Sequence, residues 1–100
     1  MRLFVCKTSE LLEGAQKSIR MGRQSVLILN YQGQFYALRN LCTHDSYALE
    51  GGRVEDGKIT CEAHGATFNF ETGAATLPAV KAVKLYKTVL EGDNLYVEEL

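Results

Sequence analysis

The order of apolar and polar residues along the chain predicts short β-strands separated by tight turns. Residues 25–30 (SVLILN) are almost continuously apolar, which is typical of a strand that is buried on both faces. Residues 34–39 (QFYALR) follow a turn and place Phe35, Ala37 and Arg39 on one face. Further strands are predicted between turn signals, at residues 3–6, 58–61, 66–70 and 95–100.

Two other segments complete the expected element order. Residues 9–14 (SELLEG) predict one helical turn that is capped by Ser9 and ended by Gly14. The only proline, Pro78, precedes residues 79–92, where apolar residues alternate with lysines as in a half-exposed strand. No stretch has the length and period of a long helix. The regular spacing of strands and turns therefore predicts an all-β barrel or sandwich.

Composition and charge narrow the classes of function. The 100 residues are 46% apolar and 23% charged, as in a single globular domain. The net charge of −1 offers no basic surface for nucleic acid or a membrane, and the longest apolar run, VLIL, is too short to span a bilayer. No secretory signal precedes Glu10, so we expect a cytoplasmic location, where three cysteines argue against a disulfide framework.

Four residues stand at metal-ligand spacing. Cys42 and His44 form a C-x-H pair, and Cys61 and His64 form a C-x-x-H pair. These are the only two histidines of the chain and two of its three cysteines, and the sixteen residues between the pairs suffice to return the chain to the first loop. Two loops with two ligands each predict a four-ligand site. The third cysteine, Cys6, lies in a predicted strand and is expected to be a buried apolar residue.

The order of the ligands bears on the kind of metal site. Zinc fingers usually carry two cysteines on one arm and two histidines on the other, whereas each arm here carries one of each. This mixed order favours a [2Fe–2S] cluster, with Cys42 and Cys61 on one iron and His44 and His64 on the other. A structural zinc module is the alternative, and colour distinguishes the two because a zinc protein is colourless.

With these motifs the chain resembles the Rieske-type ferredoxins of bacterial aromatic-ring dioxygenase systems. The resemblance rests on GQFYALRNLCTH, LEGG, DGKITCEAHGATFNFETG and LPAVKAVKLYKTVLEGDNLYV. It implies one domain over residues 1–100, an antiparallel β-sandwich or barrel in which a cluster-binding subdomain (about 41–78) is inserted into a basal β domain (1–40 and 79–100). It also implies that both histidines lie at a solvent-facing tip. One departure is Glu62, because many relatives have a proline there.

The resemblance also bears on the reduction potential. Tyr47 and Ala63 stand where respiratory relatives carry two disulfide-forming cysteines, and Ala66 and Phe68 stand where those relatives carry a serine and a tyrosine. Each missing hydroxyl removes a hydrogen bond to a cluster sulfur, which lowers the potential. We expect a potential at the low end of the Rieske range, at about −150 mV.

The function implied by the resemblance is electron transfer in aromatic hydrocarbon catabolism. The chain is expected to be no enzyme by itself but a monomeric shuttle between a flavin-containing ferredoxin reductase and a terminal ring-hydroxylating oxygenase. A small Rieske subunit of a larger redox enzyme, such as a nitrite reductase, is the alternative. Further residues are expected to assist the site. Apolar contacts to a partner are expected from Tyr47, Leu49 and Pro78, and polar contacts beside the ligand His44 from Thr43 and Asp45. Close approach of the backbone to the cluster is expected at Gly51, Gly52 and Gly65.

Overall fold

The computed structural model describes residues 2–44 and 46–100. Its larger sheet has six antiparallel strands in the order β1-β9-β8-β4-β3-β2, and its smaller sheet has three, in the order β5-β6-β7. The all-β prediction is confirmed. The elements are β1 (Arg2–Lys7), η1 (Thr8–Glu10), β2 (Gln16–Met21), β3 (Gln24–Tyr31), β4 (Gln34–Arg39), β5 (Val54–Glu55), β6 (Lys58–Thr60), β7 (Thr67–Asn69), β8 (Leu85–Glu91) and β9 (Asn94–Glu99).

The continuous apolar run of β3 is explained by two cores that share this strand. Val26 and Ile28 face a core inside the curved six-stranded sheet, together with Cys6 from β1. Leu27 and Leu29 face a second core, between that sheet and the smaller one. Successive side chains of a strand point to opposite faces, so burial on both faces requires four apolar residues in a row. The prediction for residues 25–30 is therefore confirmed, and so is the burial of Cys6, which is 5% exposed.

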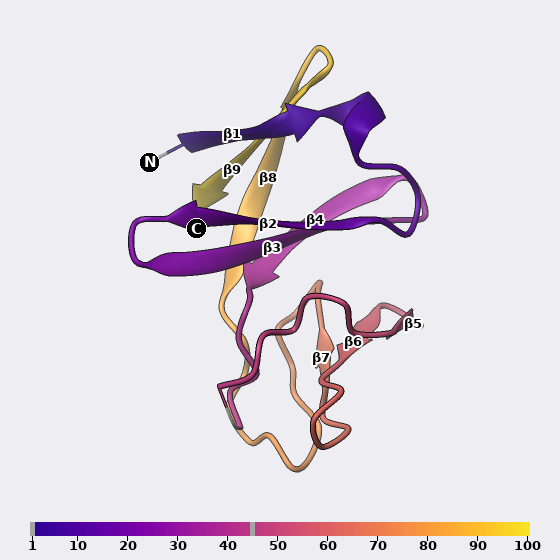
Figure 1. Cartoon of the computed structure of the whole chain (residues 1–100), viewed down its shortest axis with the longest axis vertical. Coiled ribbons are helices and arrows are strands. Elements are labelled where there is room, and N and C mark those ends of the chain that lie inside the picture. Colours follow the sequence, from indigo (N-terminus) through magenta and orange to yellow (C-terminus); the bar gives the residue numbers. More distant parts are fainter. Residues whose placement is uncertain (1, 45) are drawn as a thin grey trace.

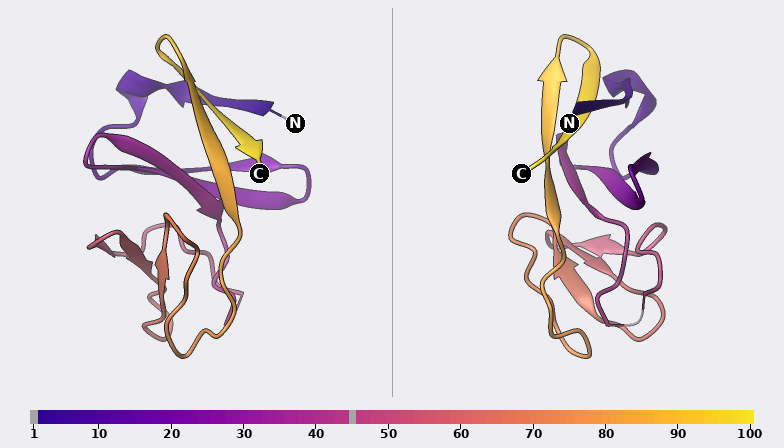
Figure 2. Two further views of the ribbon diagram at one scale, coloured as in Figure 1. Left: turned by 180° about the vertical axis from the view of Figure 1, so that it is seen from behind. Right: turned by 90° about the vertical axis from the view of Figure 1, so that its left-hand side faces the viewer.

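Figure 1 shows the small sheet and its long connections at one end of the molecule, beyond the six-stranded sheet. The chain leaves the large sheet after β4 and returns to it at β8. Figure 2 shows from two further sides that the first and last strands, β1 and β9, both belong to the large sheet. The long connections are thus held at one end of the molecule by a base that is formed from both halves of the chain.

The secondary structure differs from the predictions at several points, and the short strand β5 is one that was not predicted. Strand β2 was not predicted, because the sequence QKSIRM has charged residues at two of its six positions and lies at the edge of the sheet. Residues 79–84 are not a strand: Ala79 and Val83 pack into the second core, but Val80 is exposed, and β8 begins only at Leu85. The expected helical turn is a 3-10 helix that starts after Lys7, with Ser9 inside it.

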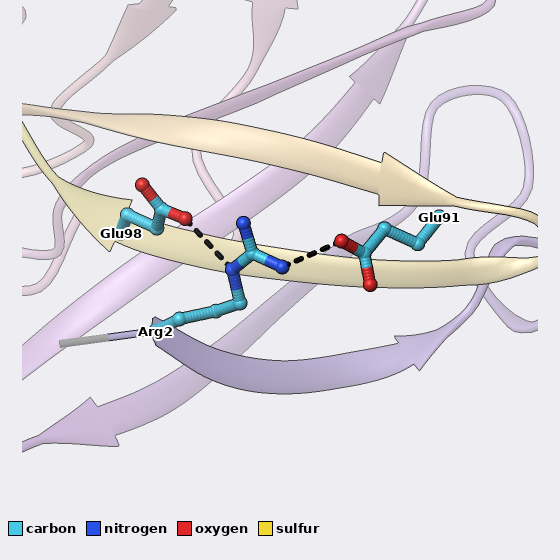
Figure 3. Close-up of polar contacts among 3 residues, drawn as sticks. All are labelled: Arg2, Glu91 and Glu98. Carbon is cyan, nitrogen blue, oxygen red and sulfur yellow. Dashed lines mark hydrogen bonds and ion pairs between the residues drawn. The ribbon is translucent and has the colours of Figure 1, made fainter.

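An ion-pair network joins the first strand to the last two. The guanidinium of Arg2 on β1 contacts the carboxylates of Glu98 on β9 and Glu91 on β8, each at 2.7 Å (Figure 3). The same guanidinium lies 5.4 Å from the ring centroid of Tyr96. These groups are exposed to solvent, so their contribution to stability is small. Among the described residues, no helix is long and apolar enough to cross a membrane.

Candidate metal centre

The first Cys–His pair lies on a tight loop directly after β4. The N–H of Cys42 donates to the carbonyl of Tyr47 at 2.7 Å, and the N–H of Ser46 donates to the carbonyl of Cys42 at 2.9 Å. Ser46 has a φ of +59°, which a residue with a side chain adopts only at a cost. The loop is therefore closed on itself by its own backbone.

The second pair lies on a loop between β6 and β7 that repeats this pattern. The N–H of Cys61 donates to the carbonyl of Ala66 at 2.7 Å, and the N–H of Gly65 donates to the carbonyl of Cys61 at 2.9 Å. Gly65, with a φ of +83°, occupies the position that corresponds to Ser46 in the first loop. Both loops thus use the same two hydrogen bonds, at four and five residues from the cysteine, although their histidines follow the cysteine at different spacings.

The two loops bring like residues together, with the thiols inside and the imidazoles outside. Cys42 and Cys61 are each 1% exposed and belong to the core between the two sheets. Their side chains are neighbours within this core. His44 and His64 are exposed, and their ring centroids lie 5.1 Å apart in an edge-to-face arrangement. The four predicted site residues are therefore arranged as two pairs, one of sulfur donors and one of nitrogen donors.

The electrostatic environment of Cys61 combines burial with backbone donors. Burial raises the pKa of the Cys61 thiol, and the neighbouring Cys42 side chain raises it further. The backbone N–H groups of Ala63 and His64 bond to the sulfur and act in the opposite direction. Such N–H groups, aimed at a cysteine sulfur, are the hydrogen bonds that stabilise a metal-bound thiolate.

The surroundings of the loops hold them from several sides. Thr43 donates its hydroxyl to the carbonyl of Lys81 at 2.7 Å, which ties the first loop to the connection before β8. Glu62 accepts a hydrogen bond from the N–H of Arg53 at 3.1 Å, so the residue that departs from the resembled family has a structural partner here. The Tyr47 ring lies 6.5 Å from that of His64 and so links the two loops. Beside it is an open depression of about 420 Å³, lined by residues 47–52 and 62–64.

The other residues named from the sequence have mixed outcomes. Leu49 is 1% exposed, so its prediction as a partner contact is wrong; its side chain fills the core beside both cysteines. Tyr47 and Pro78 are exposed, as a contact requires. Asp45 lies outside the described residues. A Cβ on Gly52 would lie 2.2 Å from the carbonyl oxygen of Thr60, whereas Gly51 and Gly65 have no described atom within 4 Å of a Cβ. The close approach of these three residues to the cluster sulfurs stays a prediction.

Two kinds of residue near the site were missed by sequence reasoning. Leu77 and Val80 are 77% and 82% exposed. The lysine alternation hid Val80 inside a predicted strand, and Leu77, just before Pro78, had no signal. Asn40 and Gln16 bond to the backbone that follows the first loop. Asn40 could have been noticed in the sequence only as a carboxamide between a predicted strand and the first Cys–His pair. Gln16 could not have been noticed, because β2 was not predicted.

The donor set and its arrangement fit a [2Fe–2S] cluster. Two neighbouring buried thiols match one iron, and two neighbouring imidazoles match the second. Within residues 2–44 and 46–100, no three Cys, His, Asp or Glu side chains gather closely enough to hold a single metal ion. When bound, such a cluster accepts and releases one electron.

Comparisons with known proteins give the family. Residues 1–87 match the Rieske [2Fe-2S] domain. The chain is 33% identical to the ferredoxin component of biphenyl 2,3-dioxygenase from Rhodococcus jostii, over 94% of this chain and 89% of that protein. It is 32% identical to the ferredoxin subunit of 3-phenylpropionate/cinnamic acid dioxygenase from Photorhabdus laumondii, over 96% of this chain and 92% of that protein.

Solved structures agree with this assignment. The ferredoxin of carbazole 1,9a-dioxygenase from Nocardioides aromaticivorans has a TM-score of 0.92 and 27% identity, covering 99% of this chain and 98% of that one. A nitrite reductase small subunit from Mycobacterium tuberculosis, itself described as putative, has a TM-score of 0.90 at 14% identity, over 100% of this chain and 96% of that one, which shows the fold alone. The family match sets the zinc alternative aside. Because it covers residues 1–87 and the ferredoxin relatives align over nearly the whole chain, this protein belongs to the Rieske [2Fe-2S] family and carries one Rieske-type cluster.

Proposed function

We propose that Cys42 and Cys61 hold one iron of the cluster and that His44 and His64 hold the other. The observation that carries this proposal is the pairing itself: two loops with the same backbone hydrogen bonds place both thiols in the core and both imidazoles at the surface. The same proposal takes residues 41–78 as the cluster-binding subdomain and residues 1–40 and 79–100 as the basal domain.

Like its ferredoxin relatives, the protein is an electron carrier and not itself an enzyme. In this proposal it takes single electrons from a flavin-containing reductase and passes them to a terminal ring-hydroxylating oxygenase, in the cytoplasm and as a monomer. A solved complex of a related carbazole 1,9a-dioxygenase ferredoxin with its oxygenase supports such an acceptor. The alternative, a small subunit of a nitrite reductase, is supported by a 14% identical structural neighbour, and that likeness shows the fold alone.

The exposed end of the molecule suits a transient contact with each partner. The imidazoles of His44 and His64 are accessible there, and Tyr47, Leu77 and Val80 add apolar surface that is 56%, 77% and 82% exposed. A small patch of this kind is typical of short-lived redox complexes, which bury less than about 1,200 Å². The exposed imidazoles are the proposed route by which an electron enters and leaves.

Serine substitutions test the ligand set. C42S and C61S are expected to abolish the visible absorbance and the iron content of the purified protein, because an alcohol is a poor ligand for iron in this setting. C6S, in the other core, is the matched control and is expected to retain both. Full cluster content in C42S or C61S would refute the assignment of ligands.

Electron flow tests the role of the carrier. Wild-type protein, mixed with NADH, a flavin-containing ferredoxin reductase and a terminal ring-hydroxylating oxygenase, is expected to be reduced by the first enzyme and reoxidised by the second. We also expect a reduction potential of about −150 mV, because Ala66 and Phe68 offer no hydroxyl donor. A clearly positive potential at neutral pH would contradict this carrier role.

A further inference from the structure

Four consecutive residues after the first ligand loop are held by two side-chain amides. The Asn40 Oδ1 accepts hydrogen bonds from the N–H of Leu49 at 2.8 Å and from that of Glu50 at 2.9 Å. The Gln16 Oε1 accepts from the N–H of Gly51 at 2.7 Å, and its Nε2 donates to the carbonyl of Gly52 at 2.9 Å. Segment 49–52 is thus bonded, residue by residue, to side chains that belong to another part of the fold.

Both amides are anchored in the six-stranded sheet. Gln16 is the first residue of β2, and Asn40 directly follows β4. Asn40 is only 9% exposed, and its Nδ2 donates to the hydroxyl of Ser25 at 3.2 Å. Its backbone N–H donates to the carbonyl of Ser25 at 2.9 Å. A buried amide with this many partners has one orientation, so it presents its oxygen to segment 49–52 in a fixed direction.

Segment 49–52 also touches the strand that carries the second ligand loop. A Cβ on Gly52 would lie 2.2 Å from the carbonyl oxygen of Thr60, the residue directly before Cys61. The N–H of Thr60 donates to the carbonyl of Arg53 at 2.9 Å. The Leu49 side chain packs in the same core as both cysteines. Movement of this segment would therefore change the position of one ligand loop relative to the other.

The outer side of the segment is open. The depression of about 420 Å³ lies against residues 47–52 and opens to solvent beside His64. On this side no described side chain packs against the segment with the density of a protein interior, so the segment is packed from the inside only. Its position therefore depends on the hydrogen bonds from Asn40 and Gln16 more than it would in a closed core.

We propose that Asn40 and Gln16 are positioning residues for the cluster, which act through segment 49–52 to set the spacing of the two ligand loops. The proposal rests on the ligand set given above. It assigns the six-stranded sheet a part in the properties of the cluster, beyond that of a passive base.

The test uses the cluster-loaded protein and two readouts. N40A and Q16M each remove bonds to segment 49–52. We expect amide hydrogen exchange of a peptide that covers this segment to become about tenfold faster for each bond lost. We also expect the electron paramagnetic resonance g values of the reduced protein and its reduction potential to shift. N40D keeps an acceptor for both N–H groups and is expected to restore slow exchange.

Matched controls separate positioning from general loss of stability. N30A removes another carboxamide of the same sheet, one that donates to the carbonyl of Leu11 at 2.9 Å. Q34M makes the same exchange as Q16M at an exposed position of β4. Both controls are expected to leave the g values, the potential and exchange in segment 49–52 unchanged, whatever they do to overall stability.

The outcomes distinguish this proposal from the ligand assignment. Unchanged g values and potential in N40A and Q16M would overturn it, and so would equal shifts in N30A. If N40A does not fold, Q16M decides, because Gln16 is only partly buried. Failure of the ligand assignment would be visible separately, as cluster retention in C42S or C61S.

Discussion

The two Cys–His loops share a backbone pattern but differ in how the rest of the molecule supports them. Each cysteine is held by hydrogen bonds of 2.7 and 2.9 Å to the same relative positions. The loop at 61–66 lies between two paired strands, β6 and β7. The loop at 42–47 has a strand on one side only, and side chains hold the other side, through Thr43 and Asn40. A common local geometry is thus reached with a regular hairpin in one case and with polar side chains in the other.

The substitution with the largest expected effect breaks the contact between segment 49–52 and the strand before the second loop. Gly52→Ala places a Cβ at 2.2 Å from the Thr60 carbonyl oxygen, and backbone atoms cannot yield as a flexible side chain can. We expect a loss of about 3 kcal/mol of stability, as for severe overpacking. At fixed guanidinium concentration, the visible absorbance should bleach about a hundredfold faster.

Gly51→Ala is the control for that substitution. Gly51 has a φ of +89° and nothing within 4 Å of its missing Cβ, so the cost is backbone strain alone, about 1–2 kcal/mol. Equal bleaching rates in the two variants would show that the close approach at Gly52 does not join the loops.

Substituting the residue with positive φ in each loop, Ser46 or Gly65, tests whether the loops are equivalent. Gly65→Ala is expected to destabilise by about 1 kcal/mol, because an alanine at a φ of +83° is strained. Ser46→Gly relieves that strain in the other loop but loosens the unfolded chain, and we expect a net gain of about 0.5 kcal/mol. The bleaching rate should rise in the first variant and fall in the second; a change of the same sign in both would contradict the equivalence of the loops.

Removing the Glu62 carboxylate tests the hydrogen bond between the backbone N–H of Arg53 and the second loop. Glu62→Ala leaves the Arg53 N–H without its partner at 3.1 Å, at an exposed position where water replaces it. We expect a cost of about 0.5 kcal/mol and a roughly twofold faster bleaching rate. Glu62→Gln keeps an acceptor and is expected to bleach at the wild-type rate; a fast Glu62→Gln would implicate the charge and not the hydrogen bond.

The smallest effect lies outside both loops, at the ion pairs of Arg2. The hydrogen bond from Arg2 lowers the pKa of Glu98. The stability that ionised Glu98 contributes is therefore fully present above the pKa of an unfolded glutamate, about 4.3. It is lost as the pH falls through the lowered pKa of Glu98 in the folded protein. The thermal midpoint of wild type should fall slightly more between pH 6 and about 3 than that of Glu98→Gln. The bleaching rate at neutral pH should be the same in both, and a difference would mean that the base and the loops are coupled through β9.

Much of the fold could be predicted from local patterns. The strands predicted at 34–39, 58–61 and 95–100 lie where alternation and turn residues placed them, within a residue at each end. Residues 79–84 and β2 were missed because edge position and packing against a second core, which alternation does not encode, decide their conformation. Leu49 was misjudged for a related reason: an apolar residue in a glycine-rich loop has no local sign of burial.

The sequence by itself determined which donors are available for a metal site, because its only two histidines and two of its three cysteines fall in two C–H motifs. The resemblance predicted that both histidines lie at a solvent-facing tip. Only the tertiary structure showed that both thiols meet in the core, since that depends on how the loops 42–47 and 61–66, which are separated by 13 residues, face each other. The tertiary structure also decided that Asn40, which follows β4, and Gln16, in β2, hydrogen-bond to segment 49–52. Hydrogen bonds between residues far apart along the chain leave no local pattern, and they become visible only when the sheet that carries them is in place.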